Sequence, residues 1–135
     1  MWTRVRPAML HGSKIWPVKK AETDRLHRAE MTMVQWMCGS CLKTRISSTE
    51  LRTKLGGITP ITEVARRRRL RWYGHVMRRE NDNWLRKACD LEVSGKACVG
   101  RPTQSWSSVV NDDIKTLGID KNLALNRDLW RAAIS

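Results

Sequence analysis

The chain contains no phenylalanine and a single tyrosine, and only 13 of its 135 residues are acidic against 26 lysines and arginines. A core without phenylalanine must use other large apolar side chains, and seven tryptophans supply most of the aromatic mass. Tryptophan carries an N–H group that needs a partner when the ring is buried. We therefore expect a sparse core, marginally stable on its own, that rests on Trp36, Trp72, Trp84, Trp106 and Trp130.

Other features are missing as well. No run of 18 apolar residues occurs, which excludes a transmembrane helix, and no apolar stretch typical of a secretory signal follows the N-terminus. We therefore expect an intracellular protein, nuclear or cytoplasmic, with reduced thiols and no membrane partner. The sequence also lacks a glycine-rich phosphate loop and a Ser/His/Asp set. It thus predicts no enzymatic activity for this chain alone, no cofactor and no small-molecule substrate.

The most informative segment that is present spans residues 66–79, where seven of fourteen residues are arginine. Arginine stays charged, and its planar fork matches phosphate oxygens in pairs. Trp72 and Tyr73 add flat faces on which a base could stack. An isolated charge run is often only a solvated helix face, but the whole chain carries a net charge of +13. We predict contact with the phosphate backbone of RNA or DNA through Arg66, Arg67, Arg68, Arg69, Arg71, Trp72, His75, Arg78 and Arg79, and through Arg101 in a later loop.

Apolar periodicity and capping patterns predict a mostly α-helical chain of about six short helices with irregular loops. Residues 1–18 are expected to be irregular or to hold a short strand. Helices are expected over 19–38, after a capping box at 47–50, over the basic stretch 60–79, and from about residues 81, 103 and 120. The composition divides the chain into a helical segment 1–93, a hinge loop 94–102 and a C-terminal helical pair 103–135. On the basic helix, Arg66, Arg67 and Arg71 are expected to point away from the apolar stripe.

The four cysteines raise a separate alternative. Cys38 and Cys41 have the spacing of half a zinc site, and a complete site needs two further ligands. Cys89 and Cys98 are the available thiols, but nine residues is not a usual spacing for the second half. We therefore predict no metal site. The alternative is a free-standing small helical interaction protein with a Cys-based structural metal site that includes Cys38 and Cys41.

Several short segments follow one another in a recognisable order. They are Arg6–Ser13, Ala29–Met31, Gln35–Gly39, Pro60-Ile61, Arg69–Arg79, Gly100–Pro102 and Trp106. Together these segments resemble the C-terminal region of the reverse transcriptases of non-LTR (LINE-type, RTE-like) retrotransposons, downstream of the polymerase active site. The first is similar to the family's Arg-Pro-Ala-Leu-Leu-Tyr-Gly-Ser, and the fifth reads Arg-Leu-Arg-Trp-Tyr-Gly-His-Val-Met-Arg-Arg.

This resemblance implies that residues 1–93 form a thumb-like segment that helps to hold template or primer. The parent enzymes copy their RNA into DNA at a nicked target, and their magnesium-binding palm carboxylates lie upstream of the matched region. The chain is therefore not expected to form a complete polymerase fold. Gly100-Arg101-Pro102 resembles the core of a minor-groove hook, although its flanks are less basic here. The resemblance is compatible both with a working fragment and with a decayed copy of an element.

Overall fold

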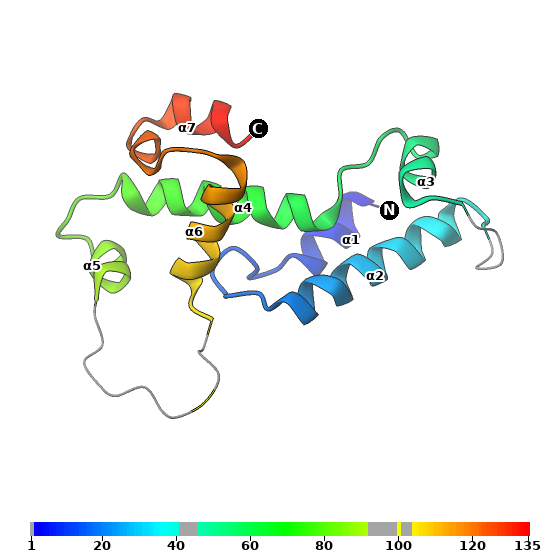
Figure 1. The fold of residues 1–135 in the computed structure, drawn as a ribbon, viewed down its shortest axis with the longest axis horizontal. Helices are drawn as coiled ribbons and strands as arrows, with labels where there is room; N and C mark the ends of the chain where they lie inside the picture. Colours follow the sequence, from blue (N-terminus) through cyan, green and yellow to red (C-terminus); the bar gives the residue numbers. More distant parts are fainter. Residues whose placement is uncertain (1, 41–45, 92–99, 101–103) are drawn as a thin grey trace. The chain divides into compact units, whose positions relative to one another are not determined.

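The computed structural model describes residues 2–40, 46–91, 100 and 104–135 (Figure 1). The chain divides into two compact units: unit 1 is Met1–His11 with Val18–Ala65, and unit 2 is Gly12–Pro17 with Arg66–Ser135. The predicted mostly helical class is confirmed, because the described residues contain no strand. They form α1 (Trp2–Met9), α2 (Lys20–Met37), α3 (Ser48–Lys54), α4 (Ile61–Met77), α5 (Trp84–Asp90), α6 (Trp106–Leu117), the 3-10 helix η1 (Lys121–Leu125) and α7 (Arg127–Ala133).

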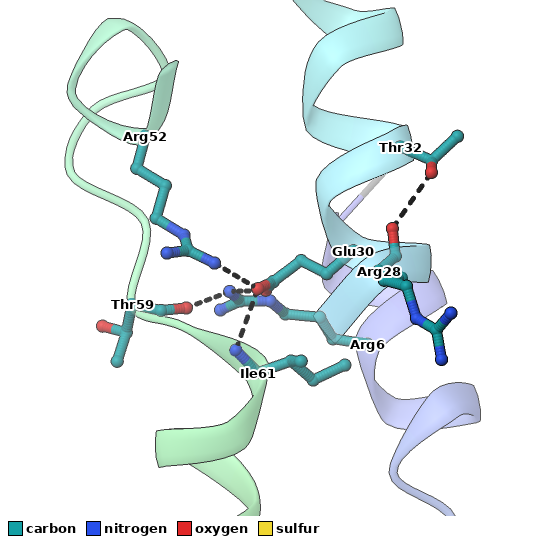
Figure 2. Close-up of polar contacts among 7 residues, drawn as sticks. All are labelled: Arg6, Arg28, Glu30, Thr32, Arg52, Thr59 and Ile61. Atoms are coloured by element: carbon teal, nitrogen blue, oxygen red, sulfur yellow. Dashed lines mark hydrogen bonds and ion pairs between the residues drawn. The ribbon is translucent and has the colours of Figure 1, made fainter. Parts of the chain in front are cut away.

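A buried carboxylate on α2 joins the helices of unit 1. Glu30 is fully buried, and its oxygens accept from Arg6 of α1 at 2.7 Å and from Arg52 of α3 at 2.8 Å (Figure 2). The same carboxylate accepts from the backbone N–H of Ile61 at 3.1 Å, and Arg6 also donates to the Thr59 carbonyl. A buried charge needs such partners, and a carboxylate is favoured at the positive N-terminal end of a helix. Glu30 therefore fixes the start of α4 against α1, α2 and α3.

The ends of several helices follow from local sequence. The Ser47 hydroxyl accepts from the Glu50 N–H at 3.2 Å, and the Glu50 carboxylate accepts from the Ser47 N–H at 3.2 Å. The predicted capping box at the start of α3 is thus confirmed. Gly39 and Gly118 follow α2 and α6 with φ of 61° and 63°, a conformation that favours glycine and stops a helix.

Unit 2 packs the later helices against the arginine-rich part of α4. Trp130 of α7 is only 2% exposed, and its Nε1–H donates to the Leu70 carbonyl at 3.0 Å. Gly74 lies directly against this ring, because a Cβ at that position would come within 2.5 Å of the indole. The buried core of the unit consists of Leu70, Val110, Ile114, Ala124, Trp130 and Ile134.

The predicted irregular or stranded N-terminus is wrong for Trp2–Met9, which forms α1, whereas residues 10–18 lie in turns and irregular structure as expected. Pro7 lies inside this helix. In a helix interior, proline removes one backbone hydrogen bond, and its ring clashes with the carbonyl four residues earlier. Helical bonding continues beyond it, with the Leu10 N–H donating to the Arg6 carbonyl at 3.0 Å. Leu10 is buried in the apolar cluster of unit 1, so tertiary packing outweighs the local breaker.

The prediction that the core rests on five tryptophans is wrong. Of the five, only Trp130 is buried, whereas Trp36 and Trp84 are 71% and 72% exposed. The position of Trp36 on α2 explains its exposure. The buried face of α2 carries Glu30 and Val34, and at about 100° per residue Trp36 lies well off that face. Smaller aliphatic side chains fill most of the core instead.

The C-terminal region contains α6, η1 and α7, so the last predicted helix occurs as two pieces. Asn126 separates them, and its side chain accepts from the N–H groups of Asp128 and Leu129. Apart from Gly100, the predicted hinge loop 94–102 lies outside the described residues. The division into 1–93 and 103–135 therefore stays a prediction. None of the described helices is both long and apolar enough to cross a bilayer.

Candidate nucleic-acid interface

Helix α4 presents two chemically different sides in unit 2. Arg69 and Val76 are 7% and 1% exposed and lie on the packed side. Arg71, His75 and Arg79 are exposed and follow one another at four-residue steps. Because four residues are slightly more than one helical turn, Arg71 and His75 lie on the same side of α4, and Arg79, just after the end of the helix, reaches His75 at 3.2 Å. The exposed side is therefore cationic, while the inner side is packed.

On the packed side, two of the predicted contact arginines bind an acid of α6. The Nε and Nη2 of Arg69 lie 2.7 and 2.6 Å from Oδ2 of Asp113, and the Nε of Arg66 lies 3.5 Å from Oδ1. The expectation that Arg66 points away from the apolar side is wrong, since the buried Asp113 attracts it inward. Arg69 is 8% exposed in its side chain and holds α4 against α6. We therefore leave Arg69 out of the contact set proposed below.

The remaining five arginines of the segment differ in their exposure. Arg71 and Arg79 are exposed, and the other three are partly buried. One of these, Arg78, donates from Nη1 to the Ala124 carbonyl at 2.8 Å, which fixes its position. No acidic residue occurs within 66–79. We use the name basic face for the set Lys14, Arg67, Arg68, Arg71, His75, Arg78 and Arg79.

Lys14 belongs to the basic face although it comes from a distant loop. Its Nζ lies 5.0 Å from the centroid of the Trp72 ring, within the range of a cation–π contact. His75 stacks on the same ring, with centroids 5.4 Å apart and planes at 28°. The loop is also fixed by Trp106, whose Nε1–H donates to the Lys14 carbonyl at 2.9 Å. No local pattern predicts this arrangement, because it joins segments far apart in the chain.

Tyr73 does not supply the exposed flat face that we had predicted. Its ring centroid lies 6.3 Å from that of Trp106 and 5.9 Å from that of Trp130, both in the packed part of unit 2. Partial burial accordingly raises the pKa of Tyr73. The hydroxyl therefore stays protonated at neutral pH, and the ring contributes to packing.

The electrostatic setting of His75 is cationic. Its pKa is lowered from the ordinary value of 6.5, first by desolvation of the ring and then by repulsion from Arg79, Arg78, Arg127 and Lys14. The Nη2 of Arg79 lies 3.2 Å from the His75 Nε2, and the Nε2 of a neutral ring can accept a hydrogen bond from it. A bound anion would counter this repulsion and raise the pKa of His75.

The described cysteines do not gather into a metal site. The Cys38 thiol donates to the Leu51 carbonyl at 3.8 Å in unit 1, while Cys89 lies on α5, and both are free thiols. Among the residues that the structure describes, no group of three or more His, Cys, Asp or Glu side chains could hold a metal ion. Cys41 and Arg101 lie outside the described residues. Because Cys98 also lies outside the described residues, the alternative of a Cys-based interaction protein stays a prediction.

A transposon-derived, uncharacterized protein of Caenorhabditis elegans is 25% identical to this chain over 142 aligned residues. The alignment covers 96% of the chain and 50% of that protein, so the chain spans about half the length of this relative. Neither a family profile nor a solved structure matches the chain. The similarity supports a transposon origin.

Proposed function

We propose that the chain derives from the thumb and post-thumb region of a non-LTR retrotransposon reverse transcriptase and contacts the phosphate backbone of RNA or DNA. The observation that carries this proposal is the exposed group of Arg71 and His75 on α4 and Arg79 just after its end. The net charge of +13 favours a polyanionic partner. The transposon-derived relative agrees with the resemblance seen in the sequence motifs.

The arrangement of the basic face favours a binding surface over a merely solvated helix side. Like charges at four-residue spacing destabilise a helix by a few tenths of a kcal/mol, and Arg67 and Arg71 form such a pair on α4. The packed side is fixed by the Arg69–Asp113 ion pair and by the contact of Trp130 with Leu70. Unit 2 thus holds neighbouring cations of the basic face on a fixed support. Phosphates bound to that face would relieve the repulsion.

In the same proposal, the chain contributes binding without nucleotidyl transfer of its own. A polymerase site needs carboxylates with free oxygens for two metal ions. The only adjacent acidic pair, Asp112 and Asp113, lies within α6. Both oxygens of Asp113 are engaged by arginines. The chemistry of the parent enzyme is therefore assigned to the palm region upstream of the matched segment.

The proposal predicts salt-dependent binding that maps to the basic face. For each phosphate contact, the logarithm of affinity should fall with the logarithm of salt at a slope of about −0.9 for duplexes and about −0.7 for single strands. The double variant Arg71→Gln with Arg79→Gln removes two exposed cations of the basic face. It should flatten the slope by about two such contacts, as measured by fluorescence anisotropy at several salt concentrations.

A matched control removes the same charge elsewhere in unit 2. Lys115→Gln with Lys121→Gln changes two exposed lysines of α6 and η1 and should leave the slope nearly unchanged. Equal flattening by both double variants would place the binding outside the basic face. No salt-dependent binding to duplex, hybrid or single strand would refute the proposed function.

The lowered pKa of His75 predicts a pH dependence. The ring is neutral in the free protein at neutral pH, and a bound phosphate raises its pKa, so binding takes up a proton. Affinity should rise as the pH falls from above about 6.5 toward the lowered pKa of the free protein, and then level off. Stability without ligand should fall over the same window, because the unfolded chain binds the proton more tightly. His75→Gln should remove most of the rise in affinity, whereas His11→Gln should retain it.

A further inference from the structure

Trp16 keeps a large apolar ring in solvent although the loop that carries it is fixed. The indole is 69% exposed, and the loop belongs to unit 2. Ser13 is buried, the Ile15 N–H donates to the Gly12 carbonyl at 3.0 Å, and the Lys14 carbonyl accepts from Trp106. The exposure of Trp16 therefore does not result from an unattached loop. Packing within unit 2 gives no reason for it.

The backbone of Gly12 supports one edge of the indole. Gly12 has φ of 72°, and a Cβ at this position would lie 3.2 Å from both Cδ1 and Nε1 of Trp16. Glycine thus allows both the left-handed backbone and the close approach of the ring. The contact holds the ring against the loop.

The loop that carries Trp16 also carries Lys14 of the basic face. Trp16 follows Lys14 by two residues, and because consecutive Cα atoms are about 3.8 Å apart, their Cα atoms lie within about 8 Å of each other. Lys14 in turn lies over Trp72 and contributes to the positive potential at His75. An aromatic ring near cations is the combination that binds single-stranded nucleic acid.

We propose that Trp16 is a stacking platform for an unpaired base of the strand whose phosphates lie on the basic face. This inference rests on the proposed function and narrows its ligand to single-stranded RNA or DNA, or to the unpaired end of a duplex. Every base has a π-face, so the contact requires no particular sequence. The cations of the basic face favour a polyanion over a neutral apolar partner.

The test compares two strands with equal numbers of phosphates, an oligothymidylate and a strand of abasic sugar-phosphates. The protein is expected to bind the oligothymidylate at least about fivefold more tightly, as expected for stacking of one base. Trp16→Ala should bring this ratio close to one, while the salt dependence of both affinities persists. Trp16→Phe should keep part of the preference. Trp36→Ala is the matched control, because it removes an equally exposed indole from α2 and should leave the ratio unchanged.

The outcomes separate this inference from the proposed function. Salt-dependent binding of both strands with equal affinity would overturn the role of Trp16 and leave the phosphate-contacting function intact. A preference for the oligothymidylate that survives Trp16→Ala, or that Trp36→Ala lowers equally, would also overturn it. If neither strand shows salt-dependent binding, the proposed function itself is refuted. Circular dichroism spectra of Trp16→Ala should match those of the unaltered chain, because the replaced ring is exposed.

Discussion

Replacing Glu30 with alanine is expected to destabilise unit 1 by about 3–5 kcal/mol, the usual cost of removing one partner from a buried ion pair. The carboxylate is fully buried, and the Arg6 and Arg52 side chains that face it are only 17% and 12% exposed. Without Glu30, both guanidinium groups lose their counter-charge, and the Ile61 N–H loses its acceptor. Small domains are stable by only about 5–15 kcal/mol. The variant should therefore lose much of the helical structure of unit 1 at modest urea concentrations.

The control for this prediction lies on the same helix. Asp24 is an exposed acid of α2, and Asp24→Ala removes the same charge. Its effect on stability should stay within about 0.5 kcal/mol. Urea titration followed by circular dichroism gives the free energies, and hydrogen exchange of the α2 amides reports on unit 1 directly. Equal stability of the two variants would show that the Glu30 cluster does not hold this unit together.

The Glu30 cluster also shows what could be predicted from the sequence. Local patterns correctly indicated the Ser47–Glu50 capping box, because it depends on a few neighbouring residues. The fully buried Glu30 was not predicted. Its partners lie 22 to 31 residues away along the chain. Contacts between residues so far apart in the sequence depend on how the helices pack. Periodicity within one helix does not specify that packing.

The Arg69–Asp113 pair illustrates the same difficulty within the candidate site. A run of arginines alone does not show which side chains point inward. A clue existed on α6, where Asp113 follows the apolar positions Trp106 and Val110 at helical spacing. An acid on an apolar stripe is buried only with a basic partner. Joining that clue to the arginine run would have identified an inward-facing arginine, although not which one.

Several residues of the segments that carry the family resemblance take part in contacts that hold each of the two units together internally. Arg6, Glu30 and Ile61, from three separate segments, form one polar cluster in unit 1. Gly74, from the arginine-rich segment, lies under the Trp130 ring in unit 2. These four residues therefore take part in packing, whereas the proposed binding depends on exposed side chains of the same arginine-rich segment. The sequence alone does not separate the two roles, because arginine and tryptophan serve in both.

Replacing Trp130 with alanine is expected to destabilise unit 2 by about 3–5 kcal/mol, the range for deleting a large buried aromatic side chain. The ring is 2% exposed and belongs to the core of the unit. Its Nε1–H donates to the Leu70 carbonyl at 3.0 Å, so the variant also loses a buried hydrogen bond. Hydrogen exchange of the α6 amides and urea titration measure the loss. Trp84→Ala, at a ring that is 72% exposed, should change stability far less.

The contact between Gly74 and Trp130 can also be tested by a substitution on α4. Here the sign of the change in stability is informative. In a helix interior, Gly→Ala normally stabilises by about 0.5–1 kcal/mol. At Gly74 the new Cβ would lie 2.5 Å from the Cδ1 and Nε1 atoms of Trp130, and the indole is held by its bond to Leu70. Gly74→Ala should therefore destabilise by about 1–3 kcal/mol, as overpacking does. In a Trp130→Ala background, which lacks the whole ring, the cost should shrink or reverse to the ordinary gain. An unchanged cost in that background would show that Gly74 is not required for the approach of Trp130.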